Sequence, residues 1–236
     1  MNDEQNFVVP DLNRAKRKGV PEVILAEGKT VVHALKIAHI FLEKNGRAIL
    51  SRVSPQLESQ LQEEFADLAE FEWYASARAA VLHRPEFERP QIGGRVGILS
   101  AGTSDLPAAE EAAMLCKEMG CEVFTTFDVG VAGLHRLFGP LRKMLEDDRV
   151  DVLIVAAGMD GALPSVVSGL SDVPVIGLPT PVGYGLGKEG IAALYSMLQS
   201  CAPGMAVVNI GNGIGAGAMA GLIANRMAAT RNGQLD

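Results

Sequence analysis

Residues 95–105 read Arg-Val-Gly-Ile-Leu-Ser-Ala-Gly-Thr-Ser-Asp, and the fold is predicted outward from this stretch. A mostly apolar run leads into a small, hydroxyl-rich loop that ends on a carboxylate. Such a run with β-branched residues is typical of a buried strand. Thr103, Ser104 and Asp105 can each accept hydrogen bonds from free N–H groups at the start of a following helix. Because helix N-termini attract anions, we expect a small-molecule site at residues 100–105.

From Arg95 onward the chain alternates between apolar strands and helices. Near-continuous apolar strands in such an alternation are typical of a parallel sheet covered by helices on both faces. Five strands favour a doubly wound, flavodoxin-like order. The predicted strands are 96–100, 122–127, 150–156, 173–178 and 206–210, and the predicted helices are 106–119, 133–147, 162–169, 188–199 and about 214–229.

Residues 1–90 have the pattern of a smaller α/β domain, so we place domains at 1–90 and 91–236. The stretch 83–90 contains two prolines, many charges and no helical period, which is typical of a linker. The predicted strands of the smaller domain are 22–26, 48–53 and 71–74, and its predicted helices are 11–18, 30–43 and one that starts at residues 54–55.

Composition excludes several classes of protein. A net charge of −7 over 236 residues argues against nucleic acid as a partner, because a general nucleic-acid binder needs a basic face. No apolar run reaches the length of a membrane span. The acidic, polar residues 1–5 do not resemble a targeting peptide. Three cysteines without a CxxC spacing favour a reducing cytoplasm over a disulfide framework or a zinc site.

Each predicted strand of the larger domain ends at a loop rich in glycine or proline. Open α/β sheets bind ligands at that carboxyl edge, and glycines let backbone N–H groups approach a ligand closely. Strand-to-helix loops also need glycine for turning, but the small, polar character of all five favours a ligand site. The loops are residues 100–105, 128–133, 157–162, 179–185 and 211–217.

The last of these loops partly fits a dinucleotide fingerprint through Gly213, Gly215 and Ala218. It follows the final predicted strand, so no later strand can supply the acidic ribose ligand that the fingerprint expects. The loop therefore indicates a helix start suited to phosphate, and only weakly an NAD-type site.

Five other side chains are candidates for chemistry. His135 and Arg136 could act as a base and an anion-binding guanidinium, or could lie on an ordinary solvated helix face. Asp105 and Asp160 could each be a helix cap, an acid, a base or a metal-associated carboxylate. Cys201 precedes the last predicted strand, at the amino edge of the sheet, and its residue context alone favours a buried structural thiol.

The motifs resemble a known family, the LarB proteins of nickel-pincer cofactor biosynthesis, whose C-terminal part is related to PurE, the aminoimidazole ribonucleotide (AIR) carboxylase/mutase. The resemblance covers almost the whole chain, and the N-terminal segments have no counterpart in PurE. The matching segments are Ala-Gly-Thr-Ser-Asp-Leu-Pro at 101–107, Asp-Val-Gly-Val-Ala-Gly-Leu-His-Arg at 128–136, Ala-Gly-Met-Asp-Gly-Ala-Leu-Pro-Ser-Val-Val at 157–167, Val-Gly-Tyr-Gly at 182–185, Ser-Cys-Ala-Pro-Gly at 200–204, Arg-Lys-Gly-Val-Pro-Glu-Val-Ile at 17–24 and Glu-Gly-Lys-Thr at 27–30.

The resemblance implies an enzyme that carboxylates the pyridinium ring of nicotinic acid adenine dinucleotide at C5, with CO₂ or bicarbonate, and hydrolyses the phosphoanhydride to release AMP. It implies Mg²⁺ beside the pyrophosphate, no organic cofactor, and a homo-octamer or other homo-oligomer with shared active sites. Cys201 would be the catalytic thiolate, which replaces the structural interpretation drawn from the residues alone. The resemblance assigns no residues to the metal.

The same resemblance assigns roles along the carboxyl edge. Ser104 and Asp105 would contact the ribose and phosphate region, residues 158–164 would bind CO₂ and the ring carboxylate, and Asp160 would serve as the base at C5 or position the hydrolytic water. The residues expected to bind the substrate are Gly102, Thr103, His135, Arg136, Gly158, Met159, Gly161, Ala162, Leu163, Pro164, Tyr184, Asn209, Asn212 and Gly213.

This chain departs from the family pattern at three places. Asp160 stands where Glu is expected, Gly211 stands where Asp is expected, and residues 188–189 are Lys-Glu where small or aromatic residues are usual. Two alternatives therefore stay open. One is PurE-type chemistry on aminoimidazole ribonucleotide, which the N-terminal domain and Cys201 disfavour. The other is a nucleotide-binding regulatory protein without turnover, supported by Asp160 and Gly211.

Overall fold

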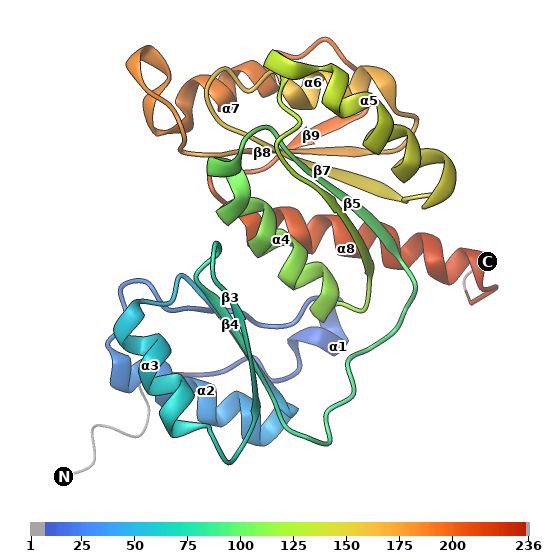
Figure 1. Cartoon of the computed structure of the whole chain (residues 1–236). Helices are drawn as coiled ribbons and strands as arrows, with labels where there is room; N and C mark the ends of the chain where they lie inside the picture. Colours follow the sequence, from blue (N-terminus) through green and yellow to red (C-terminus); the bar gives the residue numbers. More distant parts are fainter. Residues whose placement is uncertain (1–7, 235–236) are drawn as a thin grey trace. The chain divides into compact units, whose positions relative to one another are not determined.

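The computed structural model describes residues 8–234, which form two compact units that meet in sequence at Arg89 and Pro90. The acidic residues 1–5 lie outside the described residues. Figure 1 traces the chain from the N-terminal unit, in blue and cyan, to the C-terminal unit, in green to red.

The first unit is a mixed four-stranded sheet with helices packed on it. The strand order is β1-β2-β4-β3, in which β1 and β2 are parallel and the other neighbours are antiparallel. Thr30 and Ser54 cap the two longer helices by accepting N–H bonds of 3.2 Å. The elements are α1 (Arg14–Lys18), β1 (Ile24–Leu25), α2 (Val31–Asn45), β2 (Arg47–Ser51), α3 (Pro55–Glu64), β3 (Glu70–Tyr74) and β4 (Ala79–His83).

Strand β4 was not predicted, and the linker predicted at 83–90 begins one residue too early, because His83 belongs to this strand. Ala79 and Ala80 have low strand propensity, so the local sequence conceals a strand that is buried at all five positions. Burial between β2 and β3 decides its conformation, and Arg78, in the left-handed region at φ 48°, closes the hairpin before it.

The second unit is a five-stranded sheet in the order β6-β5-β7-β8-β9, with all neighbours parallel. This is the flavodoxin-like, doubly wound order that the sequence predicts, so the fold class is confirmed. Its strands are β5 (Arg95–Ser100), β6 (Glu122–Thr126), β7 (Val152–Ala157), β8 (Val175–Pro179) and β9 (Met205–Val207), and its α-helices are α4 (Leu106–Glu118), α5 (His135–Arg142), α6 (Leu163–Leu170), α7 (Ile191–Leu198) and α8 (Gly213–Arg231).

Helices cover both faces of this sheet. Figure 1 shows α4 and α8 together on one face and α5, α6 and α7 on the other. Glycines let α8 approach α4 closely, because a Cβ at Gly217 would lie 2.7 Å from the carbonyl oxygen of Ala112. Gly213, Gly217 and Gly221, which face α4 and its C-terminal end, thus serve helix packing.

Two predicted helices and one predicted strand differ in detail. The helix predicted at 133–147 is divided into helix α5 and a π-helical turn at Lys143–Asp147, after a 3₁₀ turn at Val131–Gly133. Pro140 lies inside α5 and has no N–H to donate to the helical hydrogen bonds. Residues 188–199 are helical only from Ile191, since Glu189 adopts a left-handed φ of 62°. Strand β9 ends at Val207, so the predicted strand residue Asn209 lies in a loop.

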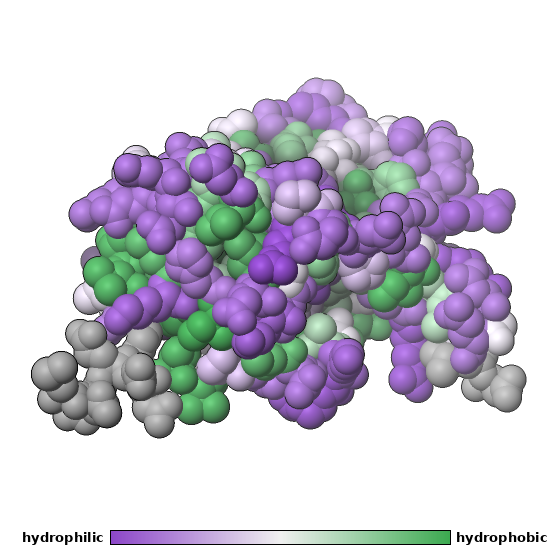
Figure 2. Space-filling model, turned by 90° about the horizontal axis from the view of Figure 1, so that it is seen from below, coloured by the Kyte–Doolittle hydropathy of each residue, from purple (hydrophilic) through white to green (hydrophobic). Residues whose placement is uncertain are grey.

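Among residues 8–234, no helix combines the length and apolar character needed to cross a lipid bilayer. Figure 2 shows one face of the molecule, where hydrophilic residues predominate and hydrophobic residues lie in separate patches between them.

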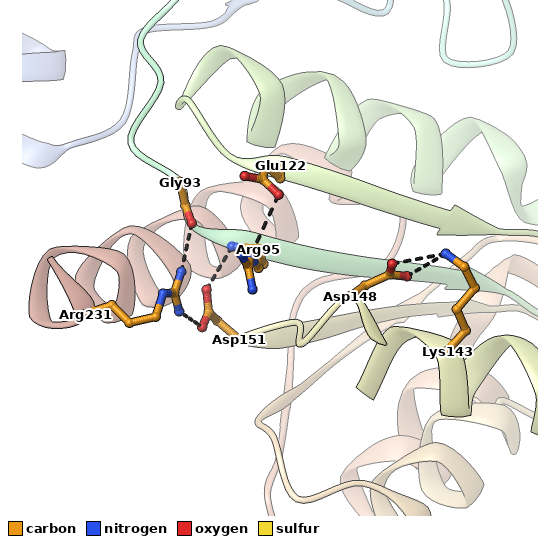
Figure 3. A network of polar contacts seen from close by, with 7 residues as sticks. All are labelled: Gly93, Arg95, Glu122, Lys143, Asp148, Asp151 and Arg231. Carbon is orange, nitrogen blue, oxygen red and sulfur yellow. Dashed lines mark hydrogen bonds and ion pairs between the residues drawn. The ribbon is translucent and has the colours of Figure 1, made fainter. Parts of the chain in front are cut away.

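Ionic contacts hold the amino edge of the second sheet (Figure 3). Asp151 accepts from the Arg231 guanidinium at 2.5 Å and from the backbone N–H of Arg95 at 2.8 Å. Arg231 also donates to the carbonyl oxygen of Gly93, at 2.8 Å. These bonds tie the end of α8 to the starts of β5 and β7.

Candidate functional site

Asp105 lies at the centre of the carboxyl edge of the second sheet. Its side chain is buried, with the residue 4% exposed, and Oδ1 accepts a 2.5 Å bond from the Thr180 hydroxyl. Oδ2 accepts a 2.9 Å bond from the N–H of Gly102, and the backbone of Gly158 also bonds this carboxylate. One carboxylate therefore joins the loops that follow β5, β7 and β8.

Burial raises the pKa of Asp105 above its ordinary value of 3.8. Desolvation is the largest cause, and the bonds from Thr180, Gly102 and Gly158 oppose it. The Asp105 side chain does not cap helix α4 itself; it accepts from Gly102 at the start of the 3₁₀ turn that precedes α4, and also from Gly158 and Thr180. The protein itself covers nearly all of the Asp105 surface, which leaves little of it open to a ligand. The contact with a ribose that was expected for Asp105 stays a prediction.

The loop after β5 presents small groups at the surface. Thr103 and Ser104 form a 3₁₀ turn with Asp105, and both side chains are exposed. Neither side chain caps helix α4 as predicted. Gly102, half-buried, donates its N–H inward to Asp105. A substrate could therefore reach the hydroxyl groups of both Thr103 and Ser104.

The loop after β6 is fastened to the loop after β5. Ser100 accepts from Asp128 N–H at its hydroxyl, at 3.4 Å, and from Val129 N–H at its carbonyl, at 3.0 Å. Arg136 donates to Asp128 at 2.5 Å, and both side chains are partly exposed. Arg136 thus lies at this edge with an acidic partner already in place, and His135 beside it is exposed.

The loop after β7 has the tightest backbone of the edge. A Cβ at Gly158 would lie 2.4 Å from the carbonyl oxygen of Val182 and 2.7 Å from the Thr180 hydroxyl oxygen. Met159 adopts a left-handed φ of 53° and donates its N–H to Val182 at 2.7 Å. Gly161, with φ 62°, packs against the backbone of Ala193. Only glycine fits at position 158 without displacing its neighbours.

Other predicted site residues of this region fall into two groups. Asp160, Met159 and Tyr184 are exposed, and one Asp160 oxygen accepts weakly from the N–H of Ala162 at 3.3 Å. Leu163 and Pro164 begin helix α6 and are buried, so they offer only packing and backbone. Asp160 is thus a reachable carboxylate next to the buried Gly158.

The start of helix α8 is occupied by the protein's own acceptors. Asn212 accepts from Gly215 N–H at 2.7 Å, and the carboxylate of Glu111 accepts from Ile214 N–H at 3.2 Å. Gly213 is buried, and a Cβ there would lie 2.5 Å from the carbonyl oxygen of Ala108. An internal carboxylate at this helix N-terminus leaves it poorly suited to phosphate, contrary to expectation. Asn209 is exposed; its side-chain oxygen accepts from the N–H of Ile210 at 2.9 Å, and its carbonyl oxygen accepts from the N–H of Asn212 at 3.2 Å.

Cys201 is exposed in the loop between α7 and β9. The interpretation of a buried thiol, drawn from its residue context alone, was wrong. The parallel topology puts this loop at the amino edge, opposite the glycine-rich loops. Within one chain, the predicted nucleophile and the predicted substrate loops therefore lie at opposite ends of the strands.

Sequence reasoning missed Thr180 as part of the site, and it gave no role to Ser100 although it expected a site at residues 100–105. Both lie at the ends of strands β8 and β5, in stretches already marked as edge loops, and both are fully buried. Their hydroxyl groups connect loops to one another. The sequence signal for them is a polar residue at the end of an apolar strand, because such a residue must find a hydrogen-bond partner when it is buried.

Comparisons with known proteins place the chain in a family. Residues 95–236 match the model of AIR carboxylase, and residues 2–84 match the LarB/PurE-like N-terminal domain. An uncharacterised protein of Methanocaldococcus jannaschii is 45% identical over 92% of this chain and 84% of its own length. The N5-carboxyaminoimidazole ribonucleotide mutase of the same organism is 35% identical over 48% of this chain and 67% of its own length.

Among solved structures, PurE of Treponema denticola matches with a TM-score of 0.45 and 24% identity, over 59% of this chain and 83% of that one. A LarB/PurE-like N-terminal domain followed by an AIR carboxylase domain in one chain is a LarB-like arrangement. The chain therefore belongs to the AIR carboxylase family, as a LarB-like member that carries the LarB/PurE-like N-terminal domain before its PurE-like domain.

Proposed function

We propose that this protein carboxylates nicotinic acid adenine dinucleotide at C5 of its pyridinium ring and hydrolyses the phosphoanhydride to release AMP, as the first step of nickel-pincer cofactor synthesis. The observation that carries this proposal is the pairing of a LarB-type N-terminal domain with an AIR carboxylase domain in one chain. The exposed thiol of Cys201 supports it, because nucleophilic catalysis needs a reachable sulfur.

The proposed chemistry needs a nucleophile because a pyridinium ring is electron-poor and cannot attack CO₂. A Cys201 thiolate adds to the ring carbon beside C5, which makes the ring a dihydropyridine with a nucleophilic C5. That carbon forms a bond to CO₂. A base then takes the C5 proton, and the ring expels the thiolate and regains aromaticity. Water afterwards cleaves the phosphoanhydride into AMP and the biscarboxylated mononucleotide.

Asp160 is the residue that we assign as the base at C5. Its carboxylate is exposed at the carboxyl edge and lies two residues from the buried Gly158. Asp105 is less suited to this task, because its two oxygens accept from Thr180 and Gly102. Asp160 is also better suited than Asp105 to hold Mg²⁺, which commonly takes one or two carboxylates and completes its shell with water and substrate phosphates. Asp160 would hold the ion during the later cleavage of the phosphoanhydride, when it no longer serves as the base at C5.

The separation of Cys201 from the glycine-rich loops supports a site built by two copies of the chain. Helix α7, which leads to the Cys201 loop, exposes large apolar side chains at helical spacing: Ile191 at 44%, Tyr195 at 63% and Leu198 at 60%. Apolar patches of this kind mark contact surfaces. A homo-oligomer, octameric by analogy with PurE-like proteins, would bring the Cys201 loop of one subunit to the carboxyl edge of another. With three free thiols in the chain, we infer a reducing, cytoplasmic setting.

The test is incubation with nicotinic acid adenine dinucleotide, bicarbonate and Mg²⁺, with AMP measured by chromatography and the second product by its mass. Product with the mass of one added carboxyl group is expected, and Cys201→Ala should abolish it. Cys121→Ala is the matched control, because that thiol is buried and bonds Asn225. Equal turnover by wild type and Cys201→Ala would contradict the assignment.

A second candidate is the reaction of the relatives named N5-carboxyaminoimidazole ribonucleotide mutase, which match about half of this chain. Incubation with N5-carboxyaminoimidazole ribonucleotide decides between the two. The LarB-like proposal expects no isomerisation of that compound, and turnover that is unaffected by Cys201→Ala would favour the mutase.

A further inference from the structure

Thr180 occupies a position that touches three loops of the carboxyl edge. It follows β8 directly, is 1% exposed, and donates its backbone N–H to Ala157 at 3.1 Å. Its hydroxyl donates to Asp105 at 2.5 Å. A Cβ at Gly190 would lie 2.5 Å from the carbonyl oxygen of Thr180, so the segment before α7 packs directly on this residue.

The hydroxyl of Thr180 has a task that packing alone does not explain. A buried carboxylate is costly unless donors surround it, and Thr180 is the side-chain donor that Asp105 receives, beside the backbone N–H groups of Gly102 and Gly158. Those two backbone donors belong to the loops after β5 and β7. The Asp105 carboxylate therefore bridges these two loops, and the Thr180 hydroxyl helps to hold it in that orientation.

These loops also carry the groups that the proposed substrate would meet. Thr103 and Ser104 are exposed immediately after Gly102, and Met159 and Asp160 are exposed immediately after Gly158. A change in the Asp105 carboxylate would shift both pairs together. Removal of the Thr180 hydroxyl would leave the carboxylate short of a donor while the volume at the site stays nearly constant.

We propose that Thr180 is a positioning residue of the nucleotide site, which acts through Asp105 to hold the loops after β5 and β7 at the spacing that binds substrate. This inference rests on the proposed function for the identity of the substrate alone. Thr180 itself is buried, so it acts without touching substrate.

The test compares Thr180→Val, which keeps the shape and removes the hydroxyl, with Thr180→Ser, which keeps the hydroxyl. Steady-state kinetics with nicotinic acid adenine dinucleotide should give a KM raised by about tenfold for Thr180→Val, the size expected for one lost bond to a charged group, with kcat changed much less. Thr180→Ser should return KM to within about twofold of wild type. An unchanged KM in folded Thr180→Val would overturn the proposal, as would a KM in Thr180→Ser that stays as high as in Thr180→Val.

Hydrogen exchange followed by mass spectrometry keeps the proposal separate from the proposed reaction. In the unliganded protein, Thr180→Val should speed amide exchange in peptides that cover residues 100–106 and 157–164, and Thr180→Ser should not. If wild type lacks turnover but this pattern is found, the proposed reaction fails and the positioning role stands. Unchanged exchange in both peptides of Thr180→Val overturns the positioning role, whatever the reaction.

Discussion

Different interactions stabilise the carboxyl edge and the amino edge of the five-stranded sheet. At the carboxyl edge, glycine backbones pack at the limit of contact and a buried carboxylate joins three loops. At the amino edge, partly exposed ion pairs such as Arg231 with Asp151 tie strand starts to the end of α8 (Figure 3). The first arrangement fixes backbone groups in place with little side-chain bulk, which suits a ligand site. The second serves stability, and Cys201 is exposed in a loop at this same edge.

The largest effect is expected from a methyl group added at the carboxyl edge. Gly158→Ala should lower the free energy of unfolding by about 2–3 kcal/mol, because the new Cβ would overlap Val182 and Thr180. Gly169→Ala in helix α6 is the matched control, since no atom lies within 4 Å of its Cβ position, and it should be neutral or stabilising by up to about 1 kcal/mol. Urea denaturation measures both, and equal effects would remove the distinction between the two sites.

Asp105→Asn tests the buried carboxylate itself. The amide nitrogen would face one of the donors that now bond Asp105, so the free energy of unfolding at neutral pH should fall by about 1–3 kcal/mol. Denaturation at neutral pH checks this value. A variant as stable as wild type would mean that the donors around Asp105 are satisfied without the charge.

The pH dependence of the same variant has a defined sign. The folded pKa of Asp105 is raised above 3.8, so the folded state binds the proton more tightly than the unfolded state. The stability from this proton is fully present below pH 3.8 and is lost as the pH rises through the folded pKa. Wild type should therefore lose stability relative to Asp105→Asn across that interval, as measured by denaturation at a series of pH values. A gain over the interval would contradict the sign.

A smaller effect is expected at the amino edge. Asp151→Ala removes the acceptor of both Arg231 and the Arg95 backbone, and should cost about 1–2 kcal/mol. Glu146→Ala is the control, because its pair with Arg142 spans 3.9 Å between exposed side chains and should be worth less than about 0.5 kcal/mol. Thermal unfolding compares them. A cost for Asp151→Ala larger than that for Gly158→Ala would reverse the ranking of the two edges.

Much of the second unit could be predicted from its sequence, because strands buried on both faces and separated by helices leave few alternatives. Short-range pattern was insufficient where burial overrides propensity, as at Ala79 and Ala80 in β4. The glycines at the start of α8 have a phosphate-binding pattern, yet the carboxylate of Glu111, about a hundred residues earlier, already accepts from a backbone N–H there. A hydrogen bond between residues so far apart in sequence leaves no local signal, and the same holds for Thr180 and Asp105.

The central claim is that the Cys201 of one subunit serves the carboxyl edge of another, and complementation between two inactive variants tests it most directly. Cys201→Ala and Asp160→Ala should each lack carboxylation of nicotinic acid adenine dinucleotide. Co-assembled in equal amounts, they should recover roughly a quarter of the wild-type rate, the share of randomly formed subunit contacts that carry both intact side chains. A mixed assembly that stays as inactive as its parents would contradict a shared site.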